Sequence, residues 1–125
     1  LKRRREIIAR YDAALKPLGV KVLPHFTSEH ESSGHLYITE IPNITYKQRG
    51  EIIMEMAERD IACNVHYKPL PMHTAYKELG FDIKDYPNAY NHFAHEITLP
   101  LHTCLTNEQV QYVIDNFVDI LREYL

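Results

Sequence analysis

The chain lacks the features that mark membrane, secreted and disulfide-rich proteins. No stretch approaches the roughly 20 apolar residues that cross a membrane, and no secretory signal is present. Its only cysteines, Cys63 and Cys104, do not belong to a Cys-x-x-Cys pair. We therefore expect reduced thiols in a cytoplasmic protein.

The chain also carries little net charge. The formal charge is -3 over 125 residues, so we expect no broad attraction to nucleic acid or to a membrane surface. One basic cluster lies at residues 2–5. Because Ile7, Ile8 and Tyr11 follow it at helical spacing, a solvated helix face is favoured over a polyanion site.

Familiar catalytic motifs are missing as well. The sequence contains no nucleophile elbow, no Walker loop, no GxGxxG and no HExxH. Eight histidines raise the question of a metal, and His92 and His95 would share one helix face beside Glu96. Two histidines need a third ligand of fixed geometry, which the sequence does not place. We favour a polar helix surface there and expect no metal site.

What is present is the composition of an ordinary globular domain. Hydrophobic residues make up 45% and charged residues 25%, and 125 residues normally form one domain. Periodicity, caps and turn residues predict helices over residues 1–17, 45–57, 73–79, 87–95 and 107–124. Strands are predicted at residues 20–23, 35–41 and 61–65, with a short extended segment at 97–101. The fold class is α+β, with a small three- to four-stranded antiparallel or mixed sheet and helices packed on one face.

The predicted elements have internal detail. Thr45 with Gln48, and Thr106 with Gln109, have the spacing of capping boxes. In the second strand, alternation places Leu36 and Ile38 on one side and Tyr37 and Thr39 on the other. The expected buried helix stripes are Ile52, Ile53, Met56 and Ala57, and later Val110, Val113, Ile114, Phe117, Ile120, Leu121 and Tyr124.

The segment CNVHYKPLPMHTAY, residues 63–76, has the most unusual chemistry. An extended apolar start leads into His66, Tyr67 and Lys68, and Pro69 and Pro71 follow. The prolines fix φ and make the turn stiff. A stiff polar turn at a strand end suits holding a ligand or a neighbouring domain, while a structural turn with Tyr67 packed and Lys68 solvated is the alternative.

A second candidate is His35, which follows Ser32, Ser33 and Gly34. Two interpretations are equally favoured. His35 is either a cleft residue oriented by a loop that Gly34 allows to approach closely, or a histidine at the strand edge that is hydrogen-bonded to that loop.

Five segments together resemble the C-terminal part of the DegT/DnrJ/StrS sugar aminotransferases. They are RREIIARYDAAL, SSGHLYITEI, QRGEIIMEMAERDIACNVHYKPL, AYKELGF and EITLPLHTCLTNEQVQYVIDNF, in family order through nearly all 125 residues. The most specific pieces are VHYKPL and LPLHTCLTNEQVQYVI.

The resemblance implies the fold of the aspartate-aminotransferase class of pyridoxal-phosphate enzymes. A large α/β domain holds the cofactor on a lysine, and a smaller C-terminal domain closes one side of the cleft. Such enzymes move an amino group, usually from glutamate, onto a keto group of a nucleotide-linked sugar. The products feed cell-surface polysaccharides and related amino sugars. The enzymes commonly work as homodimers.

The same resemblance assigns places to residues of this chain. Residues 1–18 would be the end of the interdomain helix, and residues 1–125 the small domain. The Schiff-base lysine would belong to a large domain outside this chain, so the chain would hold no catalytic residue and be inactive alone. The candidates for the substrate cleft are Ser33, His35, His66, Tyr67, Lys68, Pro69 and His73.

Two departures from the family pattern limit what is carried over. Many members have a histidine two residues after the motif proline, where this chain has Pro71 and places His73 further on. Many carry an acidic residue after the next helix's proline, where this chain reads Pro87-Asn88-Ala89-Tyr90. Sugar preference is therefore not carried over.

A different class of function stays open from the residues themselves. A free-standing α+β module could bind a small ligand through its histidines and tyrosines without catalysis. The chain opens at Leu1 inside a helical pattern with no capping residue before it, so we expect a piece of a longer protein.

Overall fold

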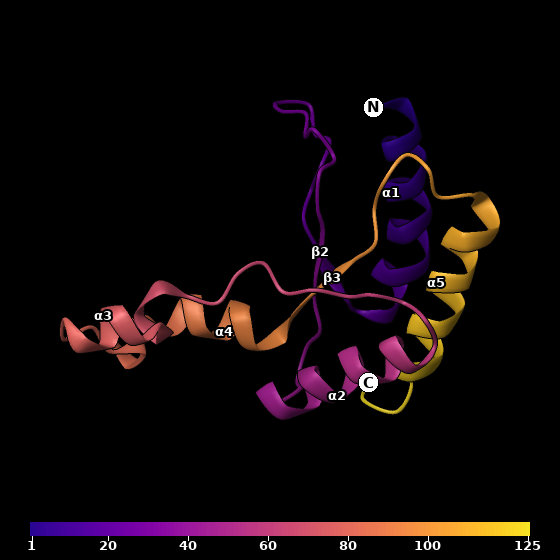
Figure 1. The fold of residues 1–125 in the computed structure, drawn as a ribbon. Helices are drawn as coiled ribbons and strands as arrows, with labels where there is room; N and C mark the ends of the chain where they lie inside the picture. Colours follow the sequence, from indigo (N-terminus) through magenta and orange to yellow (C-terminus); the bar gives the residue numbers. More distant parts are fainter.

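The three strands form one antiparallel sheet in the order β1-β2-β3 (Figure 1). The structure is a computed structural model that describes residues 1–125. The strands are β1 (Lys21–Val22), β2 (Tyr37–Glu40) and β3 (Glu96–Leu99), and the helices are α1 (Lys2–Leu15), α2 (Tyr46–Glu58), α3 (Thr74–Glu78), α4 (Pro87–His95) and α5 (Asn107–Leu121). Short 3₁₀ turns occupy Lys16–Leu18, Leu70–Met72 and Ile83–Asp85. The predicted α+β class with an antiparallel sheet is confirmed.

A single core joins α1, α2 and α5 to one face of the sheet. The largest fully buried side chains include Tyr11 of α1, Tyr37 of β2 and Phe117 of α5. Two hydroxyls in this core have partners, because Tyr11 donates to the carbonyl oxygen of Pro100 at 2.6 Å and Tyr37 donates to Asp12 Oδ1 at 2.7 Å. Burying these two phenols therefore leaves neither hydroxyl unpaired.

Both predicted capping boxes are confirmed. The Thr45 hydroxyl accepts from the Gln48 backbone N–H at 3.1 Å, and the Gln48 side chain accepts from the Thr45 N–H at 2.9 Å. Thr106 and Gln109 make the same pair of bonds at the start of α5. The expected stripe of α5 is buried from Val110 to Leu121. No helix combines the length and the apolar character that crossing a membrane requires.

The predicted strand at residues 61–65 is wrong. Only Asn64 pairs with β3, through one isolated bridge to Thr98. The ladder stops there because the next free N–H, on His66, bonds to the side chain of Glu96 instead of to a strand. Side-chain competition for backbone donors of this kind ends regular pairing.

Two details of the helices also differ from expectation. In α2, Ala57 is exposed and Arg49 is 5% exposed, because the Arg49 guanidinium lies over the rings of Tyr46 and Phe93. The basic cluster at residues 2–5 is not a uniformly solvated face, since Arg3 donates to the carbonyl oxygen of Leu105 at 2.7 Å. Periodicity alone does not reveal such buried uses of arginine.

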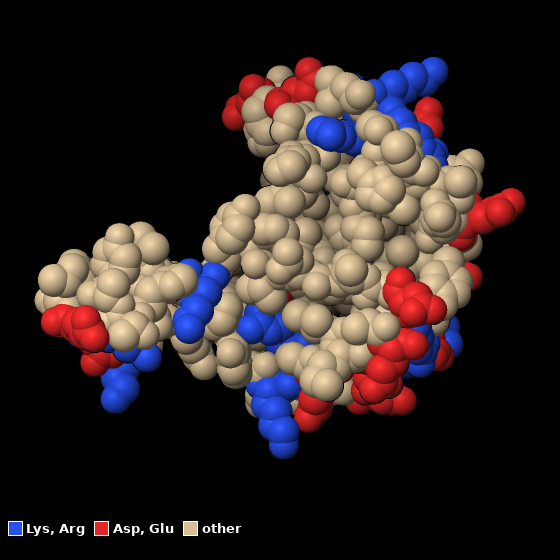
Figure 2. All heavy atoms as spheres, viewed as in Figure 1, with Lys and Arg blue, Asp and Glu red and all other residues tan.

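Residues 67–90 form an arm that projects from the body, to the left in Figure 1. It contains α3 and the first part of α4, and α4 joins β3 without a loop. The outline of the molecule is concave between this arm and the loop at residues 24–32 (Figure 2). The concavity lies on the side of the sheet away from α1 and α5, and charged side chains lie mainly around its rim (Figures 1 and 2).

Candidate functional site

The register of β2 and β3 separates two faces of the sheet. Tyr37 and Thr39 are fully buried against the helices, as the predicted alternation requires. Ile38 is paired with Thr98, and Glu40 with Glu96. Residues directly opposite in an antiparallel pair project from the same face. These four residues, Ile38, Glu40, Glu96 and Thr98, therefore define the second face of the sheet.

His66 is fixed on this second face by a closed set of hydrogen bonds. Its backbone N–H donates to Glu96 Oε2 at 2.9 Å, and its ring Nδ1 lies 2.9 Å from the Thr98 hydroxyl. The same hydroxyl donates to Glu96 Oε1 at 2.6 Å. Glu96 is fully buried and Thr98 is 6% exposed. Both anchors are thus shielded from water, which strengthens the bonds that hold the histidine.

Glu40 lies opposite Glu96 and is balanced by two basic side chains. It is hydrogen-bonded to Nδ1 of His92 from α4, and its other oxygen is 3.5 Å from Lys21 Nζ of β1. Burial pushes the pKa of Glu40 upward, but the hydrogen bond and charge of His92 and the charge of Lys21 outweigh it, so this pKa is lowered. The hydrogen bond between Glu40 and His92 connects α4, at the base of the arm, to β2 of the sheet.

A hollow of about 440 Å³ lies at the other end of β2. Ser33 and His35 line it together with His25, Leu36 and Ile38. In its wall, His25 Nδ1 is 3.0 Å from the Ser32 hydroxyl, and that oxygen accepts from the Gly34 N–H at 2.9 Å. Burial lowers the pKa of His25, while Asp12 opposes the shift.

Gly34 is required for the approach of this loop to α1. Its φ is +67°, in the left-handed region, and a Cβ here would meet the side chains of Arg4 and Ile8 at 3.2 Å. Only glycine adopts this conformation without strain and leaves room for the helix. Gly34 therefore lets the loop pass close to α1 beside the hollow.

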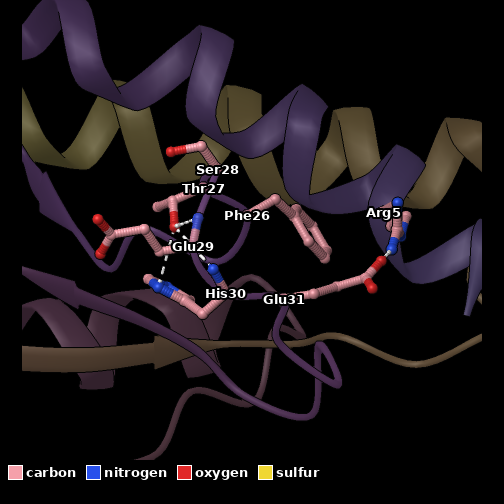
Figure 3. Close-up of a pocket in the computed structure, with 7 residues that line it drawn as sticks. All are labelled: Arg5, Phe26, Thr27, Ser28, Glu29, His30 and Glu31. Atoms are coloured by element: carbon pink, nitrogen blue, oxygen red, sulfur yellow. Dashed lines mark hydrogen bonds and ion pairs between the residues drawn. The ribbon is translucent and has the colours of Figure 1, made fainter.

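The loop at residues 24–32 is attached to α1 beside a second hollow (Figure 3). Arg5 of α1 forms an ion pair with Glu31 and lies 4.6 Å from the centre of the Phe26 ring. The tip of the loop is closed locally, because the Thr27 hydroxyl accepts from the N–H groups of Glu29 and His30. His30 lines both hollows, so this fastening sets one wall of the hollow that contains Ser33 and His35.

The remaining candidates lie along the stiff turn. Tyr67 is 72% exposed and meets the His66 ring edge-on, with centroids 4.7 Å apart. Lys68 is exposed, and its carbonyl oxygen lies 3.2 Å from His73 Nε2. Pro69 faces another way, into an apolar hollow of the arm lined also by Leu70, Pro71, Tyr76, Phe81, Tyr86 and Ala89.

The candidates thus fall into two groups, one at the hollow beside β2 and one along the turn. Ser33 and His35 share the hollow, while His66 to His73 follow the turn. Ile38 links the groups, because it lines the hollow and pairs with Thr98, which holds His66. No hydrogen bond joins the groups directly.

The cofactor of the implied family does not fit the residues of this chain alone. Covalent attachment of pyridoxal phosphate needs a lysine in a pocket, and none of the five main hollows is lined by one. No group of three or more His, Cys, Asp or Glu side chains is arranged to hold a metal ion. His92, the candidate metal ligand, is bonded to Glu40 instead.

Sequence reasoning missed the anchors Glu96 and Thr98 and the Glu40–His92 pair. The signal was present in the segment EITL, where two polar residues stand two apart in a strand and so share one face. Polar residues inside an otherwise apolar strand indicate a partner from elsewhere in the chain.

The lowered pKa of Glu40 predicts a measurable pH dependence of stability. The folded state favours the carboxylate, so this contribution is present above the ordinary pKa near 4.5 and is lost as the pH falls below it. We expect Glu40→Gln to reduce the loss of stability between about pH 5 and about pH 3. Urea unfolding across this range measures it, with Glu58→Gln, at an exposed carboxylate without ion-pair partners, as the control. Equal acid sensitivity of the wild type and Glu40→Gln would contradict the assignment.

Comparisons with known proteins identify the family of this chain. The model of the DegT/DnrJ/EryC1/StrS aminotransferase family matches residues 1–118. The spore coat polysaccharide biosynthesis protein SpsC of Bacillus subtilis is 30% identical over 127 residues, which cover 97% of this chain and 32% of that protein.

Solved structures give the same result. The PLP form of the putative sugar aminotransferase Spr1654 from Streptococcus pneumoniae is 48% identical, with a TM-score of 0.95 over 99% of this chain and 32% of that chain. Helicobacter pylori PseC, an aminotransferase involved in the biosynthesis of pseudoaminic acid, is 26% identical, with a TM-score of 0.80 over 98% of this chain and 33% of that chain. The chain spans about a third of the length of these relatives. It belongs to the DegT/DnrJ/EryC1/StrS aminotransferase family.

Proposed function

We propose that the protein containing this chain is a pyridoxal-phosphate-dependent aminotransferase. It transfers an amino group from glutamate to a keto group of a nucleotide-linked sugar, for cell-surface polysaccharide or related amino-sugar biosynthesis. The observation that carries the proposal is the 48% identity to Spr1654, a putative sugar aminotransferase with solved PLP and PMP forms. A UDP-linked amino-sugar transaminase of Helicobacter pylori, 30% identical over 118 residues, supports the substrate class.

Within that enzyme, we assign residues 1–125 to the C-terminal small domain and residues 1–18 to the end of the interdomain helix. Two observations support this division: the chain spans about a third of its relatives, and no lysine lines its main hollows. The lysine, the acid that pairs with the pyridine nitrogen and most phosphate contacts then come from a large domain.

The small domain forms one wall of the substrate cleft with the second face of its sheet. Pyridoxal phosphate, when bound in the enzyme, supplies the electron sink for amino transfer. The residues of this chain bind and orient the sugar nucleotide. The hydroxyl of Ser33 and the imidazoles of His35 and His66 suit sugar hydroxyls, and the exposed Lys68 ammonium suits the phosphates. Pro69 and Pro71 keep the turn rigid, which lowers the entropy lost on binding.

We place the enzyme in the cytoplasm, because Cys63 and Cys104 are both unpaired. Burial also raises the pKa of the Cys63 thiol to about 12, so this thiol is inert.

We further propose a homodimer in which the apolar surface of the arm is covered. Leu70 is 58% exposed, Leu79 is 74% exposed and Phe81 is 45% exposed, a large apolar content for so short a projection. In the intact protein, Leu79→Glu should shift the sedimentation velocity profile from dimer toward monomer. Met54→Glu, at a 67% exposed apolar residue of α2 outside the arm, should leave the dimer intact. A dimer unaffected by Leu79→Glu would show that the arm serves another contact.

The function itself is tested on the intact protein with pyridoxal phosphate, glutamate and nucleotide-linked keto sugars. Losing one hydrogen bond to a ligand costs on the order of 0.5–3 kcal/mol. We therefore expect His66→Ala and Tyr67→Phe to lower kcat/KM by a few-fold to about a hundred-fold. His102→Ala, at an exposed histidine that lines a different hollow from the candidate residues, serves as the matched control and should retain wild-type rates.

The outcome separates a cleft residue from a structural one. If His66→Ala retains wild-type kinetics while its melting temperature falls, the turn is structural. If the intact protein transfers no amino group to any nucleotide-linked sugar, the proposed function is wrong.

A further inference from the structure

We propose that Glu96 and Thr98 are positioning residues that hold His66 in the Nδ1-protonated tautomer, so that Nε2 accepts a hydrogen bond from a hydroxyl of the sugar. This assignment rests on the proposed function for the identity of the ligand. The tautomer itself follows from the hydrogen bonds of this chain alone.

The donors and acceptors of this network are assigned starting from Glu96. The backbone N–H of His66 can only donate, so Glu96 Oε2 must accept at 2.9 Å. The Thr98 hydroxyl donates to Glu96 Oε1 at 2.6 Å, a length typical of a hydroxyl bound to a carboxylate. Both side-chain oxygens of Glu96 are therefore acceptors in this network.

The role of the Thr98 hydroxyl in turn determines which nitrogen of the His66 imidazole carries the hydrogen. A hydroxyl has one hydrogen, and that of Thr98 is used on Glu96. Toward His66 Nδ1, 2.9 Å away, the Thr98 oxygen can only accept. Nδ1 therefore carries the hydrogen, and in the neutral ring Nε2 presents a lone pair.

The position of Nε2 makes the lone pair available. Nε2 has no hydrogen-bond partner within the chain and is not among the buried polar atoms without partners, so it reaches the surface. The bond from Nδ1 and the edge-on ring of Tyr67, 4.7 Å away, restrict rotation of the imidazole. The acceptor thus has a fixed direction.

The side chain of Glu96 is compensated mainly by hydrogen bonds and less by neighbouring charges. Arg49, 5% exposed, donates to the main-chain oxygen of Glu96 at 3.2 Å and brings a permanent positive charge to this residue. Glu40 opposes Glu96 across the strands, but Lys21 and His92 hold that second carboxylate. No cation lies within ion-pair distance of Glu96 itself, so its two hydrogen-bond donors carry the compensation.

A structural anchor alone would not need this arrangement. Burying a carboxylate is costly, and an uncharged acceptor could fix the His66 backbone at lower cost. A buried carboxylate behind an imidazole instead sets its tautomer and orientation, the role that such a group plays in hydrolytic triads. The arrangement therefore favours a histidine with a set hydrogen-bonding role.

The tautomer is measured by two-dimensional ¹H–¹⁵N spectra of the intact protein labelled at histidine nitrogens, with His66 assigned from His66→Ala. We expect Nδ1–H in the wild type and in Thr98→Ser. Glu96→Gln should give Nε2–H, because the amide oxygen must accept from the His66 N–H, so the amide nitrogen donates to Thr98 and the Thr98 hydroxyl turns to Nδ1. Nε2–H in the wild type, or one tautomer in both proteins, overturns the proposal.

Kinetics test the positioning role separately. We expect Glu96→Gln and Thr98→Val to lower kcat/KM for the sugar substrate by about tenfold or more, while Thr98→Ser stays within about threefold of wild type. Wild-type kinetics in a folded Glu96→Gln protein with a reversed tautomer would overturn the role. If no aminotransferase activity exists, the proposed function fails, while the tautomer measurement still decides the network. Should Glu96→Gln not fold, the wild-type spectrum and Thr98→Ser keep the proposal falsifiable.

Discussion

The register between β2 and β3 is the constraint on which the rest of the structure depends. Pairing Tyr37 with Leu99 sends Tyr37 and Thr39 into the helical core and leaves Ile38, Glu40, Glu96 and Thr98 on the second face. A shift of one residue would exchange the two sets, burying charge among the helices and exposing the aromatic core. Core packing and the polar network therefore demand the same register. The Thr39 hydroxyl, which donates to the Ile97 carbonyl oxygen at 2.7 Å, reinforces it.

Local signals predicted much of the fold. Capping boxes, helical stripes and alternation in residues 35–41 depend on neighbours in sequence. The predicted caps at Thr45 and Thr106 and the predicted side of the strand for Ile38 are therefore confirmed. The strand prediction for residues 61–65 is wrong. Whether this segment forms a strand depends on whether the His66 N–H bonds to a strand or to the side chain of Glu96, 30 residues away. Propensity gives no information about such a distant competitor.

The candidate site shows the same division. The turn and the His35 loop drew attention through their own chemistry, and Ser33 and His35 do line one hollow. What fixes His66 comes from β3, and what balances Glu40 comes from α4 and β1. These partners are distant in sequence, so only the sheet brings them together. Whether the candidates contact a substrate stays a prediction.

Family membership suggests a role for the second face of the sheet that the chain alone does not reveal. Membership of an aminotransferase family, matched over residues 1–118, favours a place in such an enzyme over a free-standing binding module. Three features of this chain suit one wall of a cleft. They are a stiff turn with two prolines, a loop that Gly34 brings close to α1, and a histidine held by hydrogen bonds to Glu96 and Thr98.

The most direct test of this account is the structure of the intact protein with pyridoxal phosphate and a nucleotide-linked sugar bound. The quantity of interest is the distance from His66 Nε2 to the nearest oxygen of the sugar. A cleft wall formed by the second face predicts a distance of about 3 Å, that of a hydrogen bond. A sugar bound elsewhere, with the second face of the sheet covered by protein, would contradict it.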